Sequence, residues 1–216
     1  MPRRLLLLVP AALAVAGLVA TAGSGGAASR PPDGARLDAY VDVARRLYAL
    51  EAGGTVARAA ARRLAKDPRL TAAARSGAPR ALRSAALREL FMPGRHVVRL
   101  SLRRGTDPLV DVGGRFVVAP VAKAVPGTRG AVVSASVQDV VGYVKLFHRL
   151  TGQAVVVHGA HGHAEARPTS LLHVPMPAEA GAVQVGGRPY AARTFAERGW
   201  AGEPLRVTVL VPTQRP

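Results

Sequence analysis

The spacing of the apolar residues changes from helix-like to strand-like at Pro93-Gly94, and this change restricts the fold. Before it, apolar residues recur every three or four positions, as on one face of an amphipathic helix. After it, they alternate with polar residues, as in Val98-Arg99-Leu100, which is the pattern of a half-buried strand. Helices followed by strands are typical of an α+β domain. The helical pattern covers residues 37–48, 55–65, 70–75 and 80–91.

Several segments after this point have the composition of strands, and one has the spacing of a helix. The helix is expected at residues 138–150, and a loop rich in histidine and glycine at 158–168. Gly186-Gly187 supplies a tight hairpin turn. We therefore predict amino-terminal helices followed by a mostly antiparallel sheet with one inserted helix. The strands are expected at residues 98–102, 109–112, 116–121, 130–137, 154–157, 182–185, 189–195 and 205–211.

The first residues have the order of a secretory signal sequence. Arg3 and Arg4 are followed by an apolar run over 5–20 and by small residues up to Ser29. The apolar run is shorter than the roughly 20 residues that a membrane-spanning helix needs, and it contains Pro10. We predict a cleaved signal peptide and a secreted or cell-envelope-associated protein; an uncleaved leader would instead anchor the chain to the membrane.

Length and cysteine content limit the organisation of the mature chain. About 190 residues remain after the leader, which suits one domain with its own core. The chain has no cysteine, and this excludes disulfides, thiolate metal sites and lipoprotein acylation. No cofactor is expected. The predicted parts are a signal peptide at 1–28, a linker at 29–36, a single domain at 37–211 and a tail at 212–216.

The chain is strongly basic, with a formal net charge of +17. Such an excess attracts anionic lipids, acidic polymers or nucleic acid. However, nearly all of it is arginine, and the abundant alanine, glycine and proline point to a GC-rich bacterial genome as the source of the bias. Aromatic residues, which stack on exposed bases, make up only 4% of the chain. We therefore expect no nucleic-acid partner.

Three blocks of the sequence resemble a known class of sensor domain. They are AKDPRL at residues 65–70, HVVRLSLRRGTDPLVDVGG at 96–114 and SASVQDVVGYVKLFHRLTG at 134–152. In sequence and in the order of the expected elements, residues 37–211 resemble extracytoplasmic sensor domains of the Cache type, in which a long helix leads into a PAS-like sheet. The resemblance implies a domain that binds a small molecule between its sheet and flanking loops and performs no chemistry on it.

The chain departs from this class in two respects. It lacks the arginine and aromatic signature of the amino-acid-binding members, so the resemblance does not carry over their ligand. No transmitter, kinase or chemoreceptor segment follows the last expected strand at Val211. Signalling would therefore need a membrane-bound partner, and the amino-terminal helices are candidates for pairing two subunits into a homodimer.

The candidate ligand-binding residues are cationic. Lys145 and Arg149 lie one turn apart on the expected helix 138–150, beside His148, and the resemblance places this helix near the pocket. Together with Arg115 they suit a carboxylate, because arginine binds it through two donors and lysine through a point charge. The competing interpretation is a cationic solvent-exposed face. Tyr143 and Tyr190 are candidate pocket walls, with ordinary core packing as the alternative.

A second candidate site is the histidine cluster His158, His161 and His163, with Glu165 nearby. Neutral imidazole is a good ligand for zinc, copper or nickel. The alternative is a solvated loop, because the flanking glycines do not fix the imidazoles in one geometry.

No catalytic motif is evident, and we predict that the protein is not an enzyme. Ser134, Ser136 and Ser170 lack the G-x-S-x-G setting of an activated nucleophile, and the acidic residues are sparse. The sequence favours an exported non-catalytic domain that binds a small molecule, with an organic acid or another small anion as the expected ligand. The alternatives are a cationic cell-envelope protein that binds anionic surfaces or an exported partner, and a hydrolase whose site is not visible in the sequence.

Overall fold

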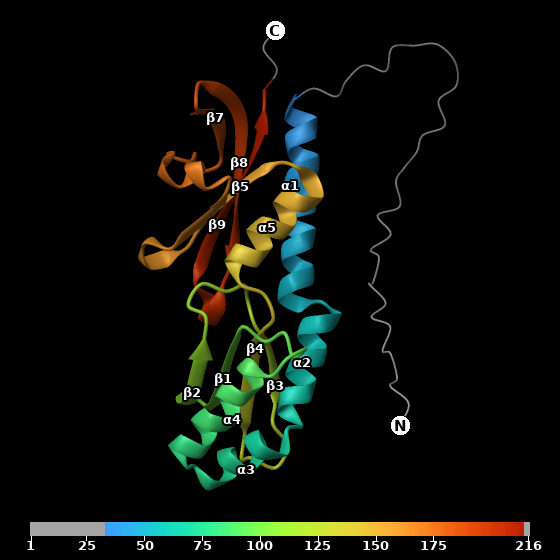
Figure 1. Ribbon diagram of the computed structural model, residues 1–216, viewed down its shortest axis with the longest axis vertical. Helices are drawn as coiled ribbons and strands as arrows, with labels where there is room; N and C mark the ends of the chain where they lie inside the picture. Colours follow the sequence, from blue (N-terminus) through green and yellow to red (C-terminus); the bar gives the residue numbers. More distant parts are fainter. Residues whose placement is uncertain (1–32, 214–216) are drawn as a thin grey trace, which may run out of the picture. The chain divides into compact units, whose positions relative to one another are not determined.

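The computed structural model describes residues 33–213 (Figure 1). Four helices come first. Asp67 fixes the start of the third, because its carboxylate accepts hydrogen bonds from the backbone N–H groups of Arg69 and Leu70 at 2.9 and 2.8 Å, and Pro68 occupies the first helical position. The helices are α1 (Asp33–Gly53), α2 (Thr55–Ala65), α3 (Pro68–Ser76) and α4 (Pro79–Phe91).

A four-stranded antiparallel sheet follows, in the order β2-β1-β4-β3. Alternate residues such as Leu100, Leu102 and Val133 point to one face, which α2, α3 and α4 cover. The small side chains of the helices, such as Ala73 and Ala86, allow close packing there. The strands are β1 (Arg99–Arg104), β2 (Asp107–Gly113), β3 (Val121–Ala124) and β4 (Ala131–Ser136).

Helix α5 (Val140–Thr151) then leads into a five-stranded antiparallel sheet in the order β6-β5-β9-β8-β7. One face of this sheet packs on α1 and α5 through residues such as Val155, Phe195 and Val209. The other face holds a smaller cluster around Leu171 of the short helix η2 (Thr169–His173). The strands are β5 (Ala154–His158), β6 (Ala164–Arg167), β7 (Ala180–Val185), β8 (Arg188–Arg198) and β9 (Pro204–Pro212).

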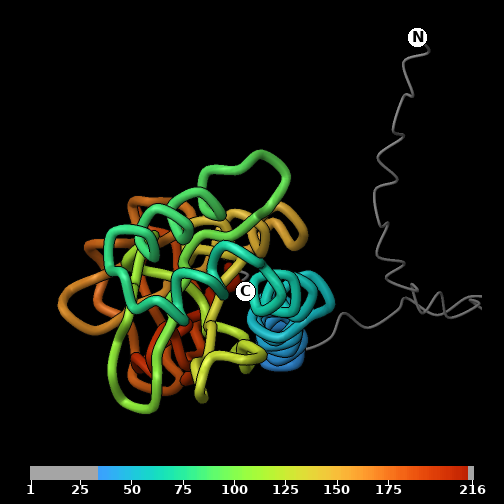
Figure 2. The backbone as a smooth tube through the Cα atoms, turned by 90° about the horizontal axis from the view of Figure 1, so that it is seen from below, coloured from blue at the N-terminus to red at the C-terminus, as the bar shows by residue number. Residues whose placement is uncertain are grey.

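Helices α1 and α2 follow each other almost end to end, with Gly54 between them (Figures 1 and 2). Gly54 N–H donates to the Leu50 carbonyl of α1 at 2.8 Å, and Arg58 N–H of α2 donates to the Gly54 carbonyl at 3.0 Å. The extended backbone of Gly54, with ψ at −176°, separates the two helices. A Cβ atom at position 54 would lie 2.2 Å from the Leu50 oxygen, so only glycine fits. Helix α1 packs on the five-stranded sheet, and α2 packs on the four-stranded sheet.

The predicted α+β class is confirmed, with helices first and one helix inserted between strands. The strands form two sheets, however, which the sequence did not separate. Helix α1 begins at Asp33, inside the predicted linker 29–36. The strand expected at 116–121 is wrong: Val117 and Val118 form only isolated bridges, because Pro120 lacks an N–H group, and β3 starts at Val121. The expected loop 158–168 contains β6.

Val56 and Phe91, two apolar residues of the expected helical segments 55–65 and 80–91, are exposed to 63% and 79%. The predicted signal peptide lies outside the described residues. Between residues 33 and 213, no helix combines the length and apolar composition needed to cross a membrane.

Candidate functional site

A cavity of 330 Å³ between α1 and α5 contains two of the predicted ligand-binding residues. Lys145 and Arg149 are exposed on α5, one turn apart, and both line the cavity. Glu51 contributes from the last turn of α1, and Gln138 from the residue before the cap of α5. Gly142 and Leu146 complete the lining. The charged groups of two helices therefore meet at one place.

The orientation of α5 follows from its ends and its buried face. The Asp139 carboxylate accepts a hydrogen bond from Gly142 N–H at 2.6 Å and caps the first turn. Gly152, in the left-handed region at φ 69°, ends the helix. The buried face consists of Val140, Tyr143, Val144 and Phe147, which leaves positions 145 and 149 on the solvent side.

Tyr143 fixes α5 against α1. Its hydroxyl donates a hydrogen bond to the Ala44 carbonyl at 3.0 Å, and its ring meets Tyr48 edge to face with centroids 5.4 Å apart. Tyr48 in turn donates to the Arg198 carbonyl at 2.6 Å, which ties α1 to β8. These contacts hold the two walls of the cavity in place.

The cavity has a positive electrostatic balance. Within the described residues, neither Lys145 nor Arg149 forms an ion pair, so their charges are not neutralised by a neighbour. Glu51 is half-buried, and this burial raises the pKa of its carboxyl group above the ordinary value. The arrangement favours a bound anion, and increasingly so when Glu51 is protonated.

The other candidate ligand residues lie elsewhere. Tyr143 is fully buried in the core, and Tyr190 packs on the opposite face of the five-stranded sheet from α5. His148 Nδ1 lies 2.8 Å from the Gln153 carbonyl at the end of α5. The Arg115 side chain is exposed, and its backbone carbonyl accepts a hydrogen bond from Arg99. Glu51 and Gln138 were not identified from the sequence, because no spacing pattern links the end of α1 to the start of α5.

The three histidines flank the turn between β5 and β6. In the described part of the chain, no three His, Asp or Glu side chains gather so that they could hold a metal ion, and His158, His161 and His163 do not form such a group. The Nδ1 atoms of His158 and His163 are buried without a hydrogen-bond partner. Burial, together with the positive charge of Arg206, lowers the pKa of His158, so its neutral form is favoured.

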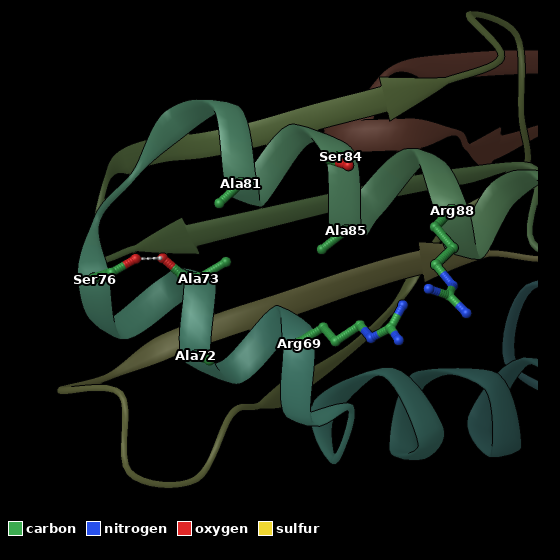
Figure 3. Close-up of a pocket in the computed structure, with 8 residues that line it drawn as sticks. All are labelled: Arg69, Ala72, Ala73, Ser76, Ala81, Ser84, Ala85 and Arg88. Atoms are coloured by element: carbon green, nitrogen blue, oxygen red, sulfur yellow. Dashed lines mark hydrogen bonds between the residues drawn. The ribbon is translucent and has the colours of Figure 1, made fainter.

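Two larger hollows lie elsewhere. One, of 510 Å³, is a groove between α3 and α4 whose walls are mainly alanine methyl groups, with Arg69 and Arg88 reaching the same end (Figure 3). The other, of 540 Å³, lies between α1 and the ends of β8 and β9 and contains Glu197, whose pKa is raised by burial against the opposing effect of Arg45. Neither brings together the cationic residues predicted to bind a ligand.

Comparisons with known proteins found similarity to solved structures only. No family model matches the sequence, and no curated protein matches it. Three solved structures with some similarity to this chain are ligand-binding domains of bacterial chemoreceptors.

Two chemoreceptors account for these structures. The domain of the amino acid chemoreceptor PctB of Pseudomonas aeruginosa PAO1, in complex with L-arginine, has a TM-score of 0.46 and 13% identity over 82% of this chain and 95% of that one. The domain of the chemoreceptor CtaA of Pseudomonas fluorescens, in complex with L-alanine, has a TM-score of 0.44 and 15% identity over 84% of this chain and 97% of that one. Its complex with L-leucine has a TM-score of 0.35 and 12% identity, with coverages of 82% and 89%.

Proposed function

We propose that this chain is an exported, non-catalytic binding domain of the sensor type, and that it binds a small organic anion in the cavity between α1 and α5. The observation that carries this proposal is the convergence of Lys145 and Arg149 on one cavity, with no ion pair to another described residue. Gln138 adds an amide that can donate or accept a hydrogen bond at the same place.

The chemistry of the lining suits recognition of a carboxylate. The guanidinium group of Arg149 offers two parallel donors, and the ammonium group of Lys145 adds a point charge. The volume of 330 Å³ falls at the lower end of the range of roughly 300–1,000 Å³ found for ligand pockets, which suits a small acid.

Lys145→Ala should weaken binding of the anion about tenfold, because a charge-assisted hydrogen bond is lost. The experiment is a thermal-shift screen of the purified protein against organic acids, amino acids and divalent metals, followed by calorimetric titration of the compounds that stabilise it. A compound at a hundredfold excess over its Kd should add about 2.7 kcal/mol of stability. Lys123→Ala is the matched control, because Lys123 is an exposed lysine of β3 and does not line the cavity.

Two results would count against the proposal. The first is a screen in which no organic acid or amino acid stabilises the protein. The second is a ligand whose affinity falls equally in Lys145→Ala and Lys123→Ala, since a general charge effect would then explain the loss. His161→Ala separates a metal effect from both, because it changes the histidine turn only.

The affinity for an organic anion should rise as the pH falls through the raised pKa of Glu51. The deprotonated carboxylate repels the anion, and protonation removes this repulsion. Glu51→Gln should therefore raise the affinity several-fold at neutral pH and flatten its dependence on pH. Calorimetric titrations of both proteins across the acidic range measure this effect. A lower affinity in Glu51→Gln would indicate instead a ligand with an ammonium group that pairs with Glu51.

The cellular setting is also part of this proposal. We place the domain outside the cytoplasm because of the leader predicted at residues 1–28, and we infer a membrane-bound signalling partner for the sensor role. Pairing of two subunits through the amino-terminal helices stays a prediction; Val43 and Leu50 are the apolar residues that α1 leaves exposed, to 39% and 50%.

A further inference from the structure

Three arginines from distant parts of the chain surround a second cavity, of 340 Å³, beside the four-stranded sheet. Arg75 comes from the last turn of α3, Arg104 from the end of β1, and Arg129 from the turn between β3 and β4. The pairing of Arg104 with Ala131 brings the end of β1 next to this turn. Gly127 and Thr128 complete the lining, which contains no acidic residue.

Backbone carbonyl groups hold two of these arginines in position. Arg75 Nε donates a hydrogen bond to the Gly127 carbonyl at 2.9 Å, and Arg104 Nη2 donates to the Ala74 carbonyl at 2.8 Å. The approach of Arg75 depends on glycine at position 127, because a Cβ atom there would lie 2.6 Å from Arg75 Nη2. Carbonyl groups are neutral, so these bonds orient the guanidinium groups and leave their charge uncompensated.

Other donors of the cluster have no partner among the described residues. Arg104 Nε is buried and makes no hydrogen bond to any of them. Across residues 33–213, Arg129 makes no hydrogen bond, and none of the three arginines forms an ion pair. Buried donors without an acceptor are rare in folded proteins, because they lose their bonds to water and gain nothing in return. An anion in the cavity would supply the missing acceptor.

We propose that this cluster, Arg75, Arg104 and Arg129, is a binding site for a phosphate group. Guanidinium groups that converge from three elements match an anion with several terminal oxygens and a charge near −2, whereas a carboxylate offers two oxygens in one plane. The volume of 340 Å³ leaves room for an organic group attached to the phosphate. This site is built on the four-stranded sheet and α3, whereas the organic-anion cavity lies between α1 and α5, so the proposal goes beyond the function proposed above.

The phosphate group has two sources, a soluble phosphate compound or a lipid headgroup, and the experiment separates them. The purified protein is titrated with inorganic phosphate and with glycerol 3-phosphate at constant ionic strength. It is also sedimented with vesicles of phosphatidylcholine alone and of phosphatidylcholine with phosphatidic acid. The test variant is Arg129→Gln, because Arg129 is exposed and makes no hydrogen bond or ion pair that the described part of the protein would lose. The matched control is Arg58→Gln on the exposed side of α2.

We expect saturable binding in at least one arm, and a loss of affinity of about tenfold in Arg129→Gln but not in Arg58→Gln. Binding of the soluble compounds identifies a free phosphate ligand, and binding of the phosphatidic acid vesicles alone identifies a lipid headgroup. Each titration and sedimentation is repeated with sodium chloride at the same ionic strength as the reference. The proposal is overturned if the binding signal in every arm is no larger than this reference signal. Equal losses in the two variants would overturn it as well, because they would reflect net charge and not the cluster.

Discussion

Replacement of Phe147 by alanine should lower the free energy of unfolding by about 3–5 kcal/mol, as expected when a large aromatic side chain is removed from a packed core. Phe147 is fully buried where α5 meets α1 and the five-stranded sheet. The surrounding residues are held by two helices and a sheet and cannot fill the space. Urea denaturation followed by circular dichroism measures the loss.

The matched control is Leu150→Ala on the same helix. Leu150 is 59% exposed, so its replacement should change stability by no more than about 0.5 kcal/mol. A loss of similar size in both variants would mean that α5 does not pack as described. The cavity that contains Lys145 would then lose one of its walls, and the proposed binding site with it.

Gly113→Ala should destabilise the protein by more than about 3 kcal/mol, because strain and a backbone clash act together. Gly113 ends β2 opposite Arg99 and has a φ of 123°, a region that residues with a Cβ rarely adopt. An added Cβ would lie 2.3 Å from the Val98 carbonyl oxygen and 2.6 Å from Arg99 Cα. Both are backbone atoms, at the first residue of β1 and the residue before it, so neither can move away easily.

Gly105→Ala serves as the comparison for this effect. Gly105 also has a positive φ, of 59°, but nothing lies within 4 Å of its added Cβ. It should therefore show only the cost of the left-handed conformation, about 1 kcal/mol. Thermal and urea denaturation of both variants separate strain from clash. Equal losses would show that the close approach of β2 to residues 98 and 99 is not rigid.

The helices were predictable because their signals are local. Asp67-Pro68 marks the boundary between the second and third helical segments, although α3 begins at Pro68 and not at Leu70 as expected. The spacing of Leu37, Val41 and Ala44 gives the buried face of α1. The division of the strands into two sheets was not predictable in this way. It depends on pairings such as β5 with β9, between segments that are far apart in the chain. The polar strand β6 forms through backbone hydrogen bonds to β5, and its sequence shows no alternation of apolar residues that would predict a strand.

Of the residues that line the candidate site, the sequence predicted the two cationic residues of α5 but not the contribution of α1. The spacing of Lys145 and Arg149 places both on one face of α5 whatever the rest of the fold is. Their partner Glu51 belongs to another helix, and only the packing of α5 on α1 brings it there. Tyr190 was predicted as a wall of the same pocket, but successive residues of a strand point to opposite faces of the sheet. Its neighbour Ala191 packs on the α1 side, so Tyr190 points to the other face.

The junction at Gly54 has a consequence for how the protein unfolds. Helix α1 supplies one half of the core of the five-stranded sheet, and α2 supplies part of the core of the four-stranded sheet. Gly54 joins them through one backbone hydrogen bond to each helix, to the Leu50 carbonyl of α1 and from Arg58 N–H of α2. Loss of either sheet would remove the support of one of these two helices, directly beside the other. The two sheets should therefore unfold together as one cooperative unit, although each has its own core.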